Sequence, residues 1–148
     1  TKVLKKTKNM NLEIYTDGGA RGNPGIAGGG VFVKTTEGSV VFEKSSFFGK
    51  KTNNESEYMA FVEALEWLAE FSKKEKIESV TLFLDSKLVV EQVNKNWRVK
   101  EARLQTFVIK SWRIIESLPY PIKIKHVLRD KNKEADLLAN QAMDAYSE

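Results

Sequence analysis

A nearly unbroken apolar run at residues 80–84, closed by Asp85, most constrains what this chain can fold into. Such runs are typical of strands buried on both faces, which occur where helices cover both sides of a sheet. Residues 12–17 alternate between apolar and polar and also end on an aspartate, Asp17, which predicts a second strand. If the two strands are parallel neighbours, their aspartates meet at one edge of the sheet, where open α/β sheets bind ligands.

Three more strands are predicted from alternation and turn residues. The pair Glu37-Gly38 predicts a hairpin turn between strands at residues 31–35 and 40–48. The glycine-rich stretch 18–30 is predicted to form turns rather than strand. A last strand is predicted at residues 122–126, so the first three strands are expected to form an antiparallel meander that two later strands join.

Apolar residues spaced by three and four predict helices between and after these strands. The strongest stripe runs from Tyr58 to Ala69, and Asn53 or Asn54 is the expected N-terminal cap. The order of elements predicts an α/β fold, with a mixed sheet and helices packed on its faces. The other helices are predicted at residues 86–93, 104–115 and 135–146.

The length of 148 residues is enough for one domain, which we expect to span residues 11–148. Residues 1–10 are predicted to be a flexible basic tail or a cloning remnant. The four lysines of this tail account for the net charge of +4, and the basic and acidic residues of the rest balance. Overall charge therefore does not argue for nucleic-acid binding, and only local placement of charge could do so.

The composition excludes several classes of protein. Without cysteine there is no disulfide, no thiolate nucleophile and no cysteine-bound zinc. No apolar run is long enough to span a membrane, and the basic N-terminus is not followed by a secretory apolar stretch. We therefore expect a cytoplasmic protein without membrane association, and a monomer.

Two further acids are placed to join Asp17 and Asp85. Glu57 falls near the start of the first long helix, off its apolar stripe, and Asp136 falls in the first turns of the last helix. Taken singly, acids at such positions usually cap turns or offset a helix dipole. Gathered at one edge, four carboxylates would repel one another, and hard divalent cations such as Mg²⁺ would relieve that repulsion. Two such ions about 4 Å apart can activate the attacking water and stabilise the leaving oxygen in phosphodiester hydrolysis.

Five motifs follow one another along almost the whole chain from residue 12 onward: Tyr15-Thr16-Asp17-Gly18-Gly19, Gly22-Asn23-Pro24-Gly25, Thr52-Asn53-Asn54-Glu55-Ser56-Glu57-Tyr58, Leu84-Asp85-Ser86, and His126 with Asn132-Lys133-Glu134-Ala135-Asp136. In this order they resemble the type 1 ribonuclease H family, in the small bacterial or archaeal form without a long basic protrusion. The resemblance implies a ribonuclease H-like mixed five-stranded sheet, three antiparallel strands plus two parallel, flanked by helices.

The resemblance also implies an activity and a metal site. The activity is endonucleolytic hydrolysis of the RNA strand of RNA–DNA hybrids, leaving 5′-phosphate and 3′-hydroxyl ends. Asp17, Glu57, Asp85 and Asp136 would bind two Mg²⁺ ions, or Mn²⁺ in their place, with Asp17 shared by both. His126 matches the family's mobile-loop histidine, which assists proton movement or product release and suits a side chain titrating near neutral pH. A histidine at a strand end is otherwise more often structural.

Substrate contacts are implied at two places. Hybrid selectivity requires groups that test for 2′-hydroxyls, and neutral amides suit this task. Gly18 and Gly19 could let the backbone approach the nucleic acid, or could serve turns alone. The family positions that touch the minor groove or a DNA-strand phosphate are matched by Asn23, Asn53, Asn54 and Thr52.

The second place is the segment at residues 94–100, which mixes cations, amides and Trp97. Its basic residues, Arg98 and Lys100 among them, could bind phosphates, although a solvated connection between helices would have a similar composition. Lys87 stands two residues after Asp85, where some relatives carry a glutamine, and it is a further candidate for a contact with substrate.

Two alternatives remain at this point. The first keeps the fold and the chemistry but changes the substrate. Double-stranded RNA is also A-like and carries 2′-hydroxyls, so the same site could cut it, and integrases, resolvases and some exonucleases share the fold. A catalytically silent binding or scaffolding module would also keep the fold. Retention of all four acids argues against the silent module, because such a cluster is costly to keep without a function.

Overall fold

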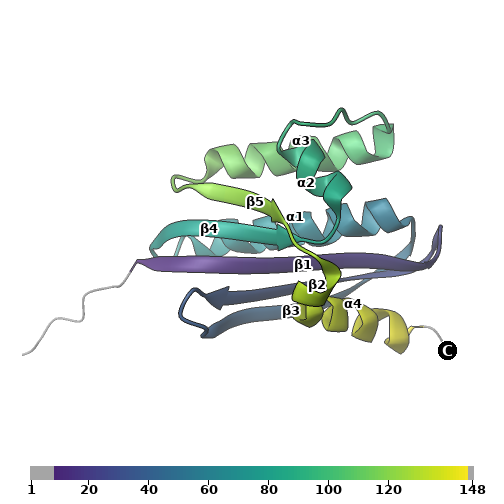
Figure 1. The fold of residues 1–148 in the computed structure, drawn as a ribbon, viewed down its shortest axis with the longest axis horizontal. Coiled ribbons are helices and arrows are strands. Elements are labelled where there is room, and N and C mark those ends of the chain that lie inside the picture. Colours follow the sequence, from purple (N-terminus) through teal and green to yellow (C-terminus); the bar gives the residue numbers. More distant parts are fainter. Residues whose placement is uncertain (1–8, 147–148) are drawn as a thin grey trace, which may run out of the picture.

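Five strands form one mixed sheet in the spatial order β3-β2-β1-β4-β5 (Figure 1). In this computed structural model, which describes residues 9–146, the first three strands are antiparallel and the last two are parallel to β1. The predicted sheet of three antiparallel and two parallel strands is confirmed. The strands are β1 (Met10–Gly22), β2 (Gly25–Thr35), β3 (Val40–Lys51), β4 (Ile77–Leu84) and β5 (Ile122–His126).

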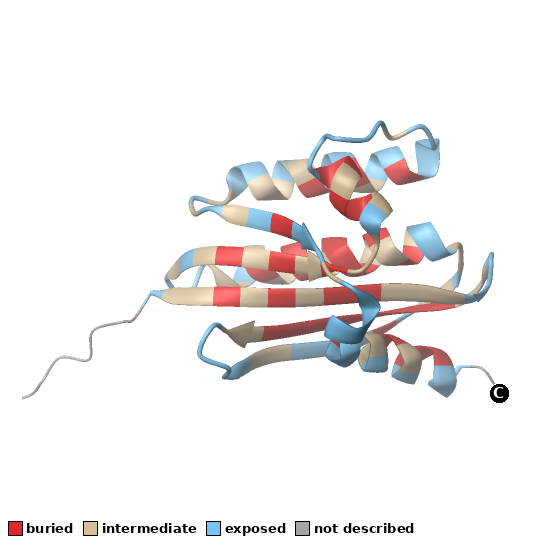
Figure 2. Ribbon diagram, in the orientation of Figure 1, coloured by how far each residue is buried: buried red, intermediate tan, exposed pale blue. Residues whose placement is uncertain are grey.

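Helices cover both faces of this sheet. On one face, α1 (Asn53–Phe71) packs over β1 and β2, and α3 packs on α1; on the other face, α4 packs over the three antiparallel strands (Figure 1). Burial alternates along β1 and β4, as the period of a strand requires (Figure 2). The remaining helices are α2 (Lys87–Val93), α3 (Ala102–Ser117), the short 3₁₀ helix η1 (Arg129–Lys131) and α4 (Lys133–Ala145).

The main core lies between the sheet and α1. Leu12 and Ile14 of β1 and Leu82 of β4 are fully buried there against Phe61 and Leu65 of α1. In the run at residues 80–84, Val80, Leu82 and Leu84 are buried on this face, whereas Thr81 and Phe83 on the other face are only half-buried. The expectation of a strand buried on both faces is therefore wrong, because α4 packs over β1, β2 and β3 and leaves β4 largely uncovered.

The prediction that residues 18–30 form turns is wrong. Most of these residues pair in the long β1–β2 hairpin, whose turn lies only at Asn23-Pro24. The glycines are there because helices pack closely on both faces. A Cβ at Gly29 would lie 2.9 Å from the side chain of Ala60 in α1, and one at Gly30 would lie 2.2 Å from the carbonyl oxygen of Ala135 in α4. Small residues thus let both helices approach the sheet beside Asp17, which pairs with Gly30.

The predicted cap of the first long helix is also wrong by one or two positions. Thr52 is the N-cap, and its hydroxyl accepts a hydrogen bond from the backbone N–H of Glu55. The Glu55 side chain accepts one in return from the N–H of Thr52. This capping box fixes where α1 begins, and therefore fixes the direction in which Glu57 points.

The tail predicted at residues 1–10 falls mainly on residues 1–8, which lie outside the described residues. Met10 is already the first residue of β1, where it pairs with Ile77. Among residues 9–146, no helix is long and apolar enough to cross a membrane.

Candidate active site

Three carboxylates from different elements converge at one edge of the sheet. Asp17 lies in β1, Asp85 directly follows β4, and Glu57 lies in the second turn of α1. One carboxylate oxygen from each lies within 4.8 Å of the others. Because β1 and β4 are parallel neighbours paired as far as Thr16 and Leu84, their next residues emerge side by side. The convergence expected from two parallel strands that end on aspartates is therefore present.

Asp136 approaches the same cluster from α4. It lies on the wall of a hollow of about 470 Å³ that Asp17 and Glu57 also line. Its carboxyl is close enough to that of Asp17 to share a hydrogen bond. All four predicted acids thus come together, although Asp136 is not among the three whose oxygens lie within 4.8 Å of one another.

Burial and mutual repulsion make these carboxyls hard to ionise. The pKa of Asp17 is raised to about 8, mainly by burial and also by the nearby Asp85 and Asp136, while the Gly18 N–H opposes the shift. Burial likewise raises the pKa of Glu57 well above its ordinary value, with added repulsion from Asp17 and Asp85. Strongly raised carboxyl pKa values in a hollow are a typical sign of a functional site.

The donor set fits hard divalent cations. The converging side-chain ligands are carboxylates, the oxygen donors that Mg²⁺ and Mn²⁺ prefer. The same crowding that raises the carboxyl pKa values would be relieved by a bound cation, because its charge opposes the repulsion. Asp17, Glu57, Asp85 and Asp136 are the residues that would hold it.

A buried amide that the sequence analysis did not single out supports this cluster. Asn132 is fully buried just before α4, and its Nδ2 donates to the backbone carbonyl of Thr16 over 2.9 Å and to Oδ2 of Asp85 over 3.4 Å. Its own backbone carbonyl accepts from the N–H of Asp136. Asn132 therefore ties together the ends of β1 and β4 and the start of α4. Its place in the motif before Asp136 was the available signal.

His126 and Arg129 lie differently with respect to the hollow. His126 ends β5, and its Nε2 lies 3.2 Å from the backbone carbonyl oxygen of Asp85. It is exposed and does not belong to the described lining of the hollow, whereas Arg129 of η1 does. A cation beside clustered acids is suited to a phosphate ligand. The sequence analysis missed Arg129 because it weighed His126 and Asp136 in this region but no cation between them.

The structure brings only part of the first group of predicted substrate residues to the same hollow, because Asn23, Thr52 and Asn54 are not in its lining. Gly18, Gly19 and Asn53 line it. Asn53 accepts a hydrogen bond from the N–H of Ala20, and the Asn23 side chain accepts one from the N–H of Asn53. These two amides also hold the β1–β2 hairpin against the start of α1. Thr52 caps that helix, and Asn54 is exposed on its first turn.

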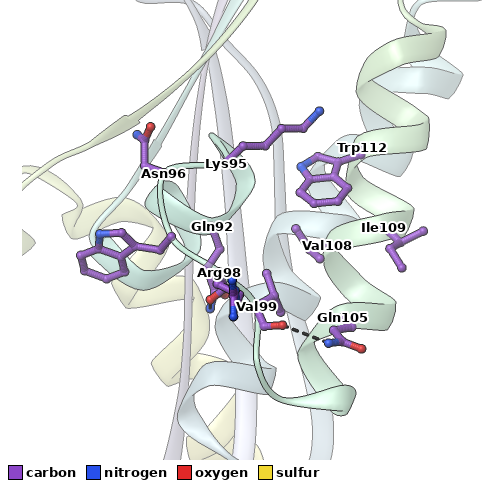
Figure 3. A pocket seen from close by; sticks show the side chains of 10 residues that line it. Gln92, Lys95, Asn96, Arg98, Val99, Gln105, Val108, Ile109 and Trp112 are labelled. Atoms are coloured by element: carbon purple, nitrogen blue, oxygen red, sulfur yellow. Dashed lines mark hydrogen bonds between the residues drawn. The ribbon is translucent and has the colours of Figure 1, made fainter.

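A second hollow of about 570 Å³ lies between the α2–α3 connection and α3 (Figure 3). Val108, Ile109 and Trp112 of α3 form one wall, and Lys95 reaches across so that its Nζ lies 5.0 Å from the centre of the Trp112 ring. Arg98 lines this hollow rather than the acidic one. Lys100 is exposed two residues further on, and Lys87 is exposed at the start of α2.

The connection between α2 and α3 spans only residues 94–101, so the described chain has no long protrusion there. The expected small form is confirmed in this respect. The structure therefore separates the predicted substrate residues into a group at the acidic hollow and a basic group at the second hollow.

Comparisons with known proteins agree with this architecture. Residues 15–142 match the reverse transcriptase-like family. The chain is 33% identical to ribonuclease HI of Halobacterium salinarum over 97% of this chain and 70% of that protein. It is 38% identical to a bifunctional protein of Mycobacterium tuberculosis over 92% of this chain, but it spans only 36% of that protein's length.

One solved structure, that of the LC11 ribonuclease H1 from compost in complex with an RNA/DNA hybrid, is similar throughout. It has a TM-score of 0.86 and 40% identity, covering 93% of this chain and 99% of that chain. With the five-stranded sheet and the converging acids, these likenesses show that the chain belongs to the type 1 ribonuclease H family.

Proposed function

We propose that the chain is an endonuclease that hydrolyses the RNA strand of RNA–DNA hybrids, leaving 5′-phosphate and 3′-hydroxyl ends. The observation that carries this proposal is the cluster of Asp17, Glu57 and Asp85, with Asp136 on the wall of the same hollow. Relatives named ribonuclease H support a nuclease that works by hydrolysis, and the solved hybrid complex of one relative supports the substrate class.

In this proposal the four carboxylates hold two Mg²⁺ ions, which Mn²⁺ can replace, and Asp17 is the shared ligand. Bound there, the ions would supply an activated water and charge stabilisation at the leaving oxygen. The chain's own part is to hold its ligands in place. The N–H of Gly18 fixes one oxygen of Glu57 over 2.9 Å, and the buried amide of Asn132 holds Asp85.

The remaining groups bind and orient the substrate. The carbonyl oxygen of the Asn53 side chain is engaged by Ala20, which leaves its amide N–H groups to donate to a 2′-hydroxyl. Arg129 on the hollow would pair with a backbone phosphate. His126, exposed beside Asp85, is placed to carry a proton between the site and solvent.

The test is cleavage of matched RNA–DNA, RNA–RNA and DNA–DNA duplexes in the presence and absence of Mg²⁺. Asp17→Asn serves as the inactive variant, and Glu37→Gln, which changes an exposed acid in the β2–β3 turn, is the matched control. We expect cutting only of the RNA in the hybrid, lost in Asp17→Asn and retained in Glu37→Gln.

Two outcomes would change the proposal. Comparable cutting of RNA–RNA would keep the chemistry and widen the substrate to A-like duplexes that carry 2′-hydroxyls. Folded wild-type protein that cuts none of the duplexes, with either Mg²⁺ or Mn²⁺, would contradict the proposal and favour a silent binding module.

A further inference from the structure

Asn140 lies one helical turn after Asp136 on α4 and contacts its carboxylate directly. Its Nδ2 donates to Oδ1 of Asp136 over 3.2 Å and to the backbone carbonyl oxygen of Asp136 over 2.9 Å. Both residues also line the acidic hollow. The hydrogen bond to Oδ1 leaves the second carboxylate oxygen, Oδ2, to face other partners.

A hydrogen bond from Arg21 fixes the orientation of the Asn140 amide. Nη2 of Arg21, near the end of β1, donates to Oδ1 of Asn140 over 3.2 Å and forms an ion pair with Asp144 over 2.5 Å. Because the amide oxygen accepts from Arg21, the amide nitrogen must face Asp136. The contacts thus run from Asp144 through Arg21 and Asn140 to Asp136, joining the β1–β2 hairpin to α4.

A neutral amide has a specific advantage at this position. It orients a carboxylate by hydrogen bonding but adds no positive charge beside the acid cluster. A lysine or arginine in its place would orient Asp136 too, but its charge would compete with a cation for the same carboxylate. Arg21, which also lines the hollow, forms its ion pair with Asp144 and donates to the amide oxygen of Asn140.

We propose that Asn140 is a positioning residue for metal binding, which holds the Asp136 carboxylate with one oxygen turned toward the cluster. This inference rests on the proposed function, because it treats Asp136 as a metal ligand. Changing the partner of a metal ligand typically lowers metal affinity about 10- to 100-fold, although the ligand itself is unchanged.

The test compares three variants of the full chain with wild type. Asn140→Leu removes the amide at similar volume, and Asn140→Gln restores an amide on a longer side chain. Gln141→Leu removes an amide from the neighbouring exposed position of α4 and is the matched control. The first readout is the rise in melting temperature of substrate-free protein across a Mg²⁺ series, measured against each variant's own metal-free value. The second is the cleavage rate against Mg²⁺ concentration and against hybrid concentration.

We expect Asn140→Leu to need about 10-fold more Mg²⁺ for the same rise in melting temperature and for half-maximal cleavage. Asn140→Gln should recover part of this loss, and Gln141→Leu should match wild type. KM for the hybrid at saturating Mg²⁺ should stay within about twofold of wild type, because the amide acts on the metal site rather than on the duplex.

An unchanged Mg²⁺ requirement in Asn140→Leu, or an equal change in Gln141→Leu, would overturn the positioning role while wild-type cleavage left the proposed function intact. Wild-type protein that neither responds to Mg²⁺ nor cuts the hybrid would overturn the proposed function and this inference with it.

Discussion

The backbone N–H of Gly18 donates a hydrogen bond of 2.9 Å to Oε1 of Glu57, which joins the acidic end of β1 to the start of α1. The contact requires the helix to lie almost against the strand. A Cβ on Gly18 would stand 2.2 Å from the carbonyl oxygen of Ser56, whereas one on Gly19 would meet only the Met143 side chain at 3.6 Å. The absence of a side chain at residue 18 therefore sets the place of Glu57.

Gly18→Ala should destabilise the protein and weaken Mg²⁺ binding together. Backbone atoms cannot yield as a flexible side chain does, so β1 and α1 must move apart. We expect a loss of about 1–3 kcal/mol in the free energy of unfolding, or more. Gly19→Ala should cost under about 1 kcal/mol, since its Cβ makes ordinary contact. Urea unfolding of both variants checks this, and equal losses would show that the close approach at Gly18 is unimportant.

The glycines between residues 18 and 30 show where the sequence alone was insufficient. Glycine is common both in turns and where backbones approach closely, and only the packing of α1 and α4 separates the two roles. The capping box of Thr52 and Glu55, by contrast, could have been predicted from the sequence, because a threonine followed three residues later by glutamate is its signature. The more general preference for asparagine caps obscured it.

The acidic cluster was predictable for a simple reason. Two strands end on Asp17 and Asp85, and parallel neighbours carry such residues to one edge. The supporting amides were not predictable in the same way. Asn132 reaches Thr16 across 116 positions of sequence, and Asn140 is oriented by Arg21 of β1. Contacts of this kind depend on how the elements pack, which no local pattern records.

Metal-free protein should lose stability as pH rises, and Asp17→Asn should remove much of that loss. The pKa of Asp17 is about 8 in the fold against an ordinary value of 3.8, so the folded protein holds a proton that the unfolded chain has released. The stability this carboxyl contributes is full below about pH 4 and is lost as pH rises through about 8.

Melting curves in EDTA between about pH 4 and pH 8.5 check this prediction. Asp17→Asn should melt several degrees above wild type at the alkaline end and nearly with it at the acidic end. Added Mg²⁺ should raise the wild-type melting temperature at pH 8 and close the gap. Glu37→Gln, on the exposed turn, keeps Asp17 and should follow wild type at every pH. A difference between Asp17→Asn and wild type that is the same at every pH would contradict the assignment.

His126→Ala should slow cleavage without abolishing it. The ring is exposed and lies against the Asp85 carbonyl, so its removal leaves the four carboxylates in place. We expect kcat to fall about 10²-fold, as for loss of a proton-transfer group, with the Mg²⁺ requirement and the melting temperature nearly unchanged. Steady-state kinetics and Mg²⁺ titration test this. A kcat equal to that of wild type would assign His126 a structural role only.

The basic residues at the second hollow should affect hybrid binding rather than chemistry. Arg98 lines that hollow, Lys100 is exposed two residues further along the chain, and neither lines the acidic hollow. The double change Arg98→Gln, Lys100→Gln should raise KM and leave kcat nearly intact. The dependence of log KM on log salt concentration should become shallower by about one for each lost phosphate contact.

The matched control is Lys74→Gln with Lys76→Gln, two exposed lysines that precede β4 and so lie at the opposite edge of the sheet from Asp85. If both pairs change KM and the salt dependence equally, the effect is a general one of net charge. If neither pair does, the segment at residues 94–100 is a solvated connection between α2 and α3. Only a change confined to Arg98 and Lys100 supports a local phosphate contact, since the two double variants remove the same charge.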